Sequence, residues 1–401
     1  MAQSSAEKTR DWSGPAVLSF GFRPFFLLGA LWAALAMMMW IVMLSGGPVL
    51  PTRFDPISWH AHEFLFGYLG AIMAGFLLTA VPNWTGRLPV VGWQLGGLVA
   101  IWVAGRIVVM TSALMPAVLV AIVDLFFPLV LGAVILREIV AGKNWRNLVV
   151  LAMLTVFALA NGLFHWNAAQ GEVAAHGTGL RLGLAMALMM VSVIGGRVVP
   201  SFTRNWLVKA GSDARPAPPM QRFDKATLLV TLAGLLIWVV WPGHPVTGII
   251  LLIIAALQTA RLIRWKGLHT KAEPLVWVLH AGYAFVPTGA LAVGVSILFP
   301  QLLGMAAAQH IWMAGAIGLM TLGVMTRATL GHTGQNLHAG PATIGIYLAI
   351  IGSVAMRLSA SALPDMAMPL YGLSAVFWIM AFGGFTVAYG PLLMRPKPAR
   401  V

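Results

Sequence analysis

Residues 57–82 read ISWHAHEFLFGYLGAIMAGFLLTAVP, and this stretch decides the fold. After Glu63 it holds no charged side chain. An apolar run of about 20 residues is what a helix needs to cross the hydrocarbon core of a bilayer. Histidine and glutamate are costly inside a membrane, where they usually face the bundle interior and have a function. We therefore predict a membrane-crossing helix with a candidate site near its beginning.

The rest of the chain repeats this character. Of the 401 residues, 59% are hydrophobic and 9% are charged, and the mean hydropathy is +0.87. A soluble domain carries about 25% charged residues, so this composition excludes a water-soluble fold, and disorder as well. Long apolar runs also differ from the short alternating segments of a membrane β-barrel. We predict an all-α, polytopic membrane protein, a single integral membrane domain over residues 1–401, with about twelve transmembrane helices at 24–46, 57–82, 93–112, 115–136, 147–167, 177–200, 225–242, 246–263, 275–299, 304–326, 341–359 and 367–392.

The basic residues predict the orientation in the membrane. With the exception of Arg53, the loops that hold Lys and Arg alternate with loops that hold almost none. The basic loops and tails contain Lys8, Arg10, Arg87, Arg137, Lys143, Arg146, Arg204, Lys209, Arg215, Arg222, Lys225, Arg261, Arg264, Lys266, Lys271, Arg395, Lys397 and Arg400. By the positive-inside rule both termini are cytoplasmic, as is the polar linker at about 205–224 between the two halves. The formal charge of +14 therefore reflects membrane topology and contact with lipid, not nucleic-acid binding.

The ends of three predicted spans resemble one another. They read Val81-Pro82-Asn83-Trp84-Thr85-Gly86-Arg87, Val199-Pro200-Ser201-Phe202-Thr203-Arg204 and, more weakly, Val324-Met325-Thr326-Arg327. The repeat period of four spans predicts three four-helix units around a pseudo-threefold axis. The plain alternative is that all three are outward-to-inward helices that end in the same interface signal.

Histidines are the main candidates for metal binding, because the chain has no cysteine. Imidazole is the commonest ligand of haem iron and copper, although a lone histidine in a helix is more often a hydrogen-bonded interior residue. We interpret His244, His269 and His338 as surface residues. The other seven lie in or beside spans and form an outer group and an inner pair: His60, His62, His165, His176 and His310, then His280 and His332.

The sharpest local feature is Trp59-His60-Ala61-His62-Glu63. Residues two apart on an α-helix point about 200° from each other. His60 and His62 are therefore expected to serve two neighbouring centres, or to bind one copper if the helix start is unwound. Glu63 would orient His60 or transfer protons. A polar helix start, with Glu63 favoured by the helix dipole, is the structural alternative.

Other charges within the spans have structural explanations. Arg106 and Asp124 lie at similar depth on adjacent antiparallel spans, so we expect a structural ion pair. Five arginines at inner helix ends are expected to reach lipid phosphates, or to contact haem propionates: Arg23, Arg87, Arg197, Arg204 and Arg327.

Several motifs together resemble the NnrS family. They are Gly21-Phe22-Arg23-Pro24-Phe25-Phe26, Trp59-His60-Ala61-His62-Glu63, Gly75-Phe76-Leu77-Leu78-Thr79-Ala80-Val81-Pro82-Asn83-Trp84-Thr85-Gly86-Arg87, Gly195-Gly196-Arg197-Val198-Val199-Pro200-Ser201-Phe202-Thr203-Arg204, Leu279-His280-Ala281-Gly282-Tyr283 and Met325-Thr326-Arg327-Ala328-Thr329-Leu330-Gly331-His332-Thr333-Gly334. The resemblance implies a bacterial inner-membrane protein that contains haem b and copper and is linked to denitrification and nitric oxide resistance. The family's patterned histidines correspond to His60, His62, His280, His310 and His332. His165 and His176 lie outside these motifs and rank second.

Three functional hypotheses follow. The first is a haem- and copper-binding protein that counters nitric oxide stress, either by binding nitric oxide or by redox conversion at His-ligated metal centres. The second is a membrane transporter of a metal or metal complex that uses the outer and inner histidine sites. The third is a structural or sensory membrane protein without turnover.

Overall fold

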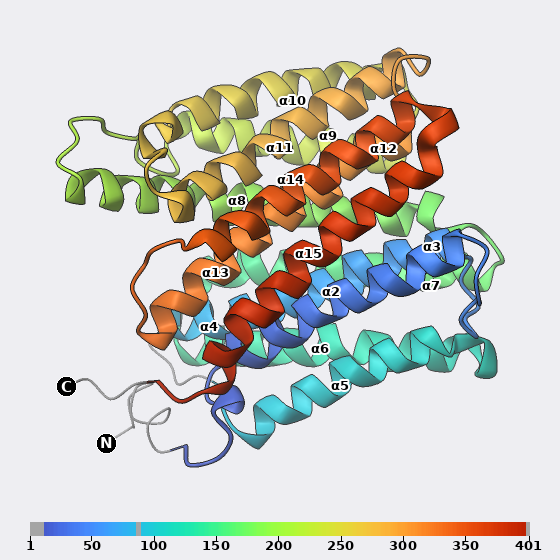
Figure 1. The fold of residues 1–401 in the computed structure, drawn as a ribbon, viewed down its shortest axis with the longest axis horizontal. Helices are drawn as coiled ribbons and strands as arrows, with labels where there is room; N and C mark the ends of the chain where they lie inside the picture. Colours follow the sequence, from blue (N-terminus) through green and yellow to red (C-terminus); the bar gives the residue numbers. More distant parts are fainter. Residues whose placement is uncertain (1–11, 86–89, 398–401) are drawn as a thin grey trace. The chain divides into compact units, whose positions relative to one another are not determined.

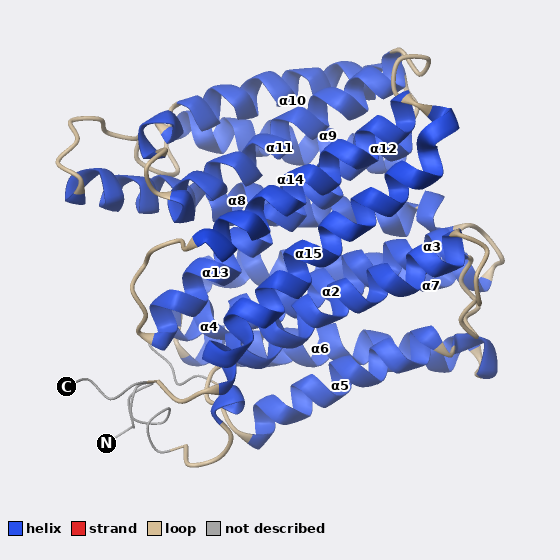
Figure 2. Cartoon of the chain, in the orientation of Figure 1, coloured by secondary structure: helices blue, strands red, loops and turns tan. Residues whose placement is uncertain are grey.

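The protein is an all-helical membrane protein with twelve candidate spans, as the hydropathy predicts (Figures 1 and 2). The computed structural model describes residues 12–85 and 90–397, with the side chains of 83–85 left out, and no strand occurs in these residues. The candidate spans are Phe22–Leu44, Pro56–Pro82, Trp93–Met110, Ala117–Ala141, Trp145–Ala169, Thr178–Lys209, Arg222–Val240, Pro245–Ile263, Pro274–Leu298, Met305–Thr333, Pro341–Ala362 and Pro364–Met394.

Most spans consist of one long α-helix. These helices are α2 (Phe22–Leu44), α5 (Trp93–Met110), α6 (Ala117–Ala141), α7 (Leu148–Ala169), α8 (Thr178–Lys209), α9 (Arg222–Val240), α10 (Pro245–Ile263), α11 (Pro274–Leu298), α14 (Pro341–Ala362) and α15 (Ala367–Met394). Short 3₁₀ turns precede or follow several of them: η1 (Ala16–Leu18), η3 (Ser112–Leu114), η4 (Trp145–Asn147), η5 (Ala174–His176), η6 (Gly267–Thr270) and η8 (Pro364–Met366).

The second and tenth spans differ, because a π-helix interrupts each of them. The second runs through α3 (Pro56–His62), η2 (Glu63–Tyr68) and α4 (Leu69–Thr85). The tenth runs through α12 (Met305–His310), η7 (Ile311–Leu319) and α13 (Met320–Thr333). In both, a histidine is the last α-helical residue before the π-segment. Wider helical turns of this kind are rare and frequently mark functional sites.

Local sequence explains where the second span begins. Asp55 has extended backbone angles, and its Oδ1 accepts hydrogen bonds from the backbone N–H groups of Ile57 and Ser58, both at 3.0 Å. Pro56 occupies the first helical position, where a missing N–H costs nothing. This cap places His60 and His62 within two turns of the helix start.

The contacts within the chain divide it into two compact units. Unit 1 comprises residues 1–183, 329–335 and 385–401, and it contains α2 to α7. Unit 2 comprises residues 184–328 and 336–384. The polar connection between α8 and α9 covers residues 210–221, within the predicted linker. The pseudo-threefold arrangement of three four-helix units stays a prediction.

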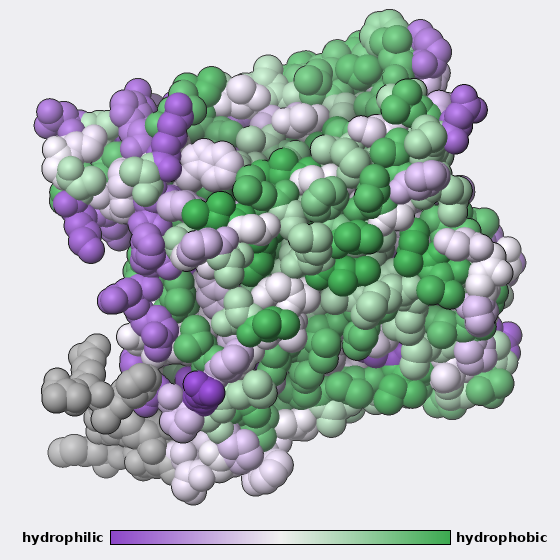
Figure 3. Space-filling view, viewed as in Figure 1, coloured by the Kyte–Doolittle hydropathy of each residue, from purple (hydrophilic) through white to green (hydrophobic). Residues whose placement is uncertain are grey.

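The outer surface is apolar along the helices. Figure 3 shows hydrophobic residues along the helix lengths, with hydrophilic residues mainly at helix ends and connections. Large exposed side chains such as Leu129, Leu159 and Val387 would be unfavourable in water. In a bilayer they contact lipid chains, so the surface fits the predicted environment.

The orientation can be tested because the natural chain has no cysteine. Asp213→Cys lies in the connection between α8 and α9, and Gln170→Cys lies between α7 and α8. With cytoplasmic termini, an impermeant maleimide should label Gln170→Cys in intact spheroplasts, and should label Asp213→Cys only after permeabilisation. The reverse pattern would contradict the predicted orientation.

Candidate metal centre

A buried polar cluster in unit 1 joins four helices around Asp124 of α6. Asp124 Oδ2 accepts hydrogen bonds from Asn161 Nδ2 at 2.7 Å and His165 Nε2 at 3.0 Å, both on α7. His62 Nε2 on α3 lies 3.2 Å from the same oxygen. Arg106 of α5 binds the other oxygen through its Nη2. Asp124 is buried, so these donors replace the water that would otherwise solvate its charge.

Glu63 is the second carboxylate of the cluster. It follows His62 directly, at the first position of the π-helix, and it is fully buried. Arg106 Nη1 lies 2.7 Å from its Oε1 and 2.8 Å from its Oε2. Trp32 Nε1 of α2 donates to Oε2 at 2.7 Å. The guanidinium of Arg106 therefore bridges Glu63 and Asp124, and with Trp32 these contacts link α2, η2, α5 and α6.

Both ring nitrogens of His62 lie within hydrogen-bond distance of an oxygen atom. Its Nδ1 lies 3.1 Å from Glu63 Oε1, and its Nε2 lies 3.0 Å from Asn161 Oδ1. The amide of Asn161 is oriented by its Nδ2, which donates to Asp124. When Glu63 is ionised and Asn161 Oδ1 faces the ring, both ring nitrogens of His62 donate, because carboxylate and carbonyl oxygens only accept. The imidazolium and Arg106 then balance the charges of Glu63 and Asp124.

Three of these side chains form a candidate metal site. One ligand atom from each of His62, Asp124 and His165 lies within 4.8 Å of the other two, and all three residues are buried. Two imidazoles and one carboxylate suit a transition metal such as copper, zinc or iron. Asn161, Arg106 and Glu63 hold the ligands in place, as hydrogen-bond partners of metal ligands commonly do.

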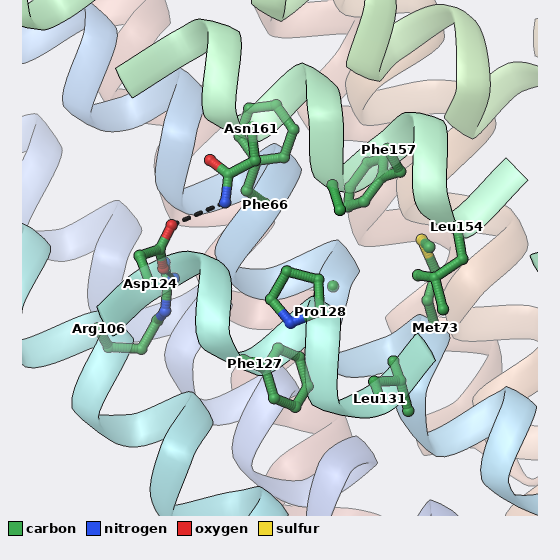
Figure 4. A pocket seen from close by; sticks show the side chains of 12 residues that line it. Phe66, Met73, Arg106, Asp124, Phe127, Pro128, Leu131, Leu154, Phe157 and Asn161 are labelled. Carbon is green, nitrogen blue, oxygen red and sulfur yellow. Dashed lines mark hydrogen bonds and ion pairs between the residues drawn. The ribbon is translucent and has the colours of Figure 1, made fainter. Parts of the chain in front are cut away.

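The cluster has apolar surroundings. Figure 4 shows Asp124, Arg106 and Asn161 beside a cavity whose other walls include Phe66, Phe127, Pro128 and Phe157. The cavity measures about 10 Å³, room for about one water molecule. On another side, the ring of Phe54 stacks on His62, with the ring centres 5.4 Å apart. Such walls keep the local dielectric low, which strengthens each ionic contact.

The other predicted ligands in unit 1 do not join this cluster. The ring of His60 stacks on Trp40, with the ring centres 4.1 Å apart. His332 lies against Phe20 and Phe22, with ring centres 5.7 and 5.3 Å away. His176 is exposed at the turn before α8. Among the described residues of unit 1, two predicted ligands therefore lie together in this cluster. They are His62, one of the first-ranked histidines, and His165, one of the two that ranked second.

In unit 2, His280 and His310 have their own partners. His280 Nε2 lies 2.7 Å from the hydroxyl of Thr203, and Gly267 packs closely against its ring. His310 Nδ1 lies 2.6 Å from the backbone carbonyl of Ala306, to which it donates. Both histidines remain candidate ligands.

The five arginines have different surroundings. Arg23 Nη1 donates to three backbone carbonyls at the end of α15, those of Leu392, Leu393 and Arg395. Arg327 lies over the ring of Phe202, 4.1 Å from its centre. The remaining three are either exposed, as are Arg197 and Arg204, or outside the described residues, as is Arg87.

A second buried ion pair occurs in unit 2. Arg261 Nε on α10 donates to Asp224 Oδ1 on α9 at 2.8 Å, and its Nη1 donates to the hydroxyl of Tyr283 at 2.8 Å. Tyr283 in turn donates to Gln258 Oε1 at 2.7 Å. The set is charge-balanced, and the named members include no histidine. We infer that these polar contacts have a structural role and hold α9, α10 and α11 together.

Sequence reasoning missed two members of the unit 1 cluster, Asn161 and Trp32. Asn161 precedes His165 by four residues, so the two lie on the same face of α7. This spacing is the sequence signal that could have identified Asn161.

A second signal that sequence reasoning missed is a residue spacing shared by the two spans that a π-helix interrupts. The pattern His-x₄-Gly-x₂-Gly-x₄-Gly occurs at His62, Gly67, Gly70 and Gly75, and again at His310, Gly315, Gly318 and Gly323.

Fold and site together define a polytopic membrane protein with a buried imidazole–carboxylate cluster. The sequence matches the NnrS protein family over residues 16–397. The chain therefore belongs to the NnrS family. No curated protein matches the sequence.

The close packing of Arg106 gives a prediction about Gly67. A Cβ at Gly67 would lie 2.5 Å from Arg106 Nη1 and 2.8 Å from Glu63 Oε2, whereas a Cβ at Gly70 would meet nothing within 4 Å. Gly67→Ala should therefore destabilise the fold by about 1–3 kcal/mol. Gly70→Ala should be neutral or stabilising by up to about 1 kcal/mol. Thermal unfolding in detergent would measure both, and equal effects would contradict the packing described.

Proposed function

We propose that this NnrS protein binds copper at His62, Asp124 and His165 and uses the bound metal to counter nitric oxide stress. The observation that carries the proposal is the convergence of two imidazoles and one carboxylate, within 4.8 Å of one another, in a buried place. Ionisable groups inside a membrane are costly, so a buried cluster of them is by default a candidate functional site. Copper is the metal that the resemblance to the family implies.

Charge balance supports copper in its monovalent state. The cluster described above is neutral when His62 is an imidazolium. A cation bound to both rings would replace the hydrogen on His62 Nε2, while the hydrogen on His165 Nε2 would move to Nδ1 of the same ring. The cluster then gains the charge of the ion and loses one proton, so a monovalent ion leaves the total at zero. A divalent ion leaves a surplus positive charge in a low-dielectric interior, which is costly. Imidazole is a good ligand for copper.

The chain's own residues would orient the ligands. His62 keeps its Nδ1–H directed at Glu63, which fixes the ring with Nε2 toward Asp124. Asn161 and Arg106 hold the Asp124 carboxylate from two sides. A bound copper ion would supply an electrophilic centre and a redox couple for a small ligand. Nitric oxide is uncharged and small, so a site inside the bilayer is accessible to it.

Haem b, the other cofactor that the resemblance implies, is proposed on the same ground, with His60, His280, His310 and His332 as candidate ligands. His60 and His332 contact aromatic rings, His280 contacts a hydroxyl, and His310 contacts a backbone carbonyl. The cavity beside Asp124 holds about 10 Å³, far below the roughly 300–1,000 Å³ of a typical cofactor pocket, so it does not fit haem.

The proposal predicts which variants lose copper. His62→Gln and His165→Gln should each lose the copper of this site, because each removes one of the three ligands. His269→Ala is the matched control, since His269 is exposed in the loop before α11. Metal analysis of protein purified in detergent, loaded separately with copper, iron(II) and zinc, makes the measurement. Size-exclusion profiles would confirm that the variants are folded.

Each result decides a part of the proposal. Copper retained in both glutamine variants would overturn the site, and a preference for iron(II) or zinc would overturn the choice of metal. Nitric oxide should change the spectrum of the copper-loaded wild type and the His269→Ala variant, but not those of the other two. Copper movement across sealed vesicles, without any spectral response to nitric oxide, would instead favour the transporter hypothesis.

A further inference from the structure

A second cavity in unit 1 lies between α2 and α5. Its volume is about 170 Å³. Its walls come from α2 and α5: Leu28, Leu31, Trp32, Leu35, Trp102, Val103, Arg106, Ile107 and Met110. Two of these residues, Trp32 and Arg106, also hold Glu63 in the cluster described above. Two residues that line this cavity therefore also hold the candidate metal centre in place.

The cavity reaches from the lipid-facing surface toward that cluster. Leu31 and Leu35 on α2 are each 38% exposed, and Ile107 on α5 is 50% exposed. By contrast, Trp102 is 3% and Arg106 is 5% exposed. Both helices are candidate membrane spans, so the exposed rim faces lipid chains. The opening is thus lateral, toward the bilayer.

The polar atoms of Arg106 offer no hydrogen bond to a molecule in this cavity. Arg106 uses Nη1 for Glu63 and Nη2 for Asp124. Its Nε is buried and has no hydrogen-bond partner among the residues that the structure describes. Apart from Arg106 and the indoles of Trp32 and Trp102, apolar side chains form the walls.

We infer that this cavity is the access route and holding site for a small, uncharged, lipid-soluble molecule of the size of a diatomic gas. An apolar cavity of about 150 Å³ in another protein holds benzene or xenon, so 170 Å³ is ample for such a molecule. It is too small for drug-sized ligands, whose pockets hold roughly 300–1,000 Å³. As a route to a bound metal, the inference rests on the proposed function. As a gas-holding site, it does not.

Xenon is a suitable probe because its binding requires no metal. We expect xenon density in this cavity in pressurised crystals of the wild type. Val103→Trp and the smaller change Val103→Phe should fill the cavity and remove that density. Ile122→Trp is the matched control, because Ile122 is 60% exposed on α6 and does not line the cavity. This variant should keep the xenon.

The second readout is nitric oxide association with the copper-loaded protein. Val103→Trp should slow association by about tenfold or more, as obstructed binding does, while copper content and the Ile122→Trp rate stay at the wild-type level. Three results would overturn the inference: no xenon in the wild type, a lipid chain in the cavity instead, or an unchanged association rate once the cavity is filled. Xenon bound without any copper would support the holding site and contradict the proposed function.

Discussion

A carboxylate buried among membrane-spanning helices must be neutralised where it lies, and Asp124 imposes this constraint on unit 1. Its neighbours come from three other helices: Arg106 from α5, His62 from α3, and Asn161 and His165 from α7. Removing one partner from such a group leaves an uncompensated charge that water cannot reach. The helices are therefore held at the spacing that the polar contacts require, even though lipid gives apolar faces little reason to pack in one particular way.

Hydropathy was sufficient to predict the number of spans, since each apolar run is long enough to cross a bilayer. It was less accurate at the ends. The span predicted at 177–200 continues to Lys209, because its last turns carry Arg204 and other exposed residues that lower hydropathy without ending the helix. A helix can project beyond the bilayer, and sequence periodicity alone does not mark where lipid stops.

The site was harder to predict than the fold, because sequence gives the depth of a residue better than the direction of its side chain. His60 and His62 lie at one helix start, yet His62 meets Asp124 while His60 stacks on Trp40. The sequence interpretation treated Asp124 as a structural partner of Arg106. That contact is present, but the same carboxylate also accepts from His165. The π-helix that begins at Glu63, which hydropathy does not reveal, changes the phase of the residues that follow.

The polar cluster and the lateral cavity share Arg106 and Trp32. The two features therefore fit a single function in unit 1. Charged groups that hold a cation must be kept from water, whereas an uncharged ligand must still reach them. An apolar opening toward lipid meets both conditions, because it admits molecules that dissolve in the bilayer and excludes ions. In this account, the same residues position the ligands and form the wall along which the small molecule approaches.

Anomalous diffraction at the copper absorption edge, from crystals of the copper-loaded protein, tests the central claim most directly. The account predicts the strongest peak among His62 Nε2, Asp124 Oδ2 and His165 Nε2. A peak at His60, His280, His310 or His332, with none inside this cluster, would contradict it.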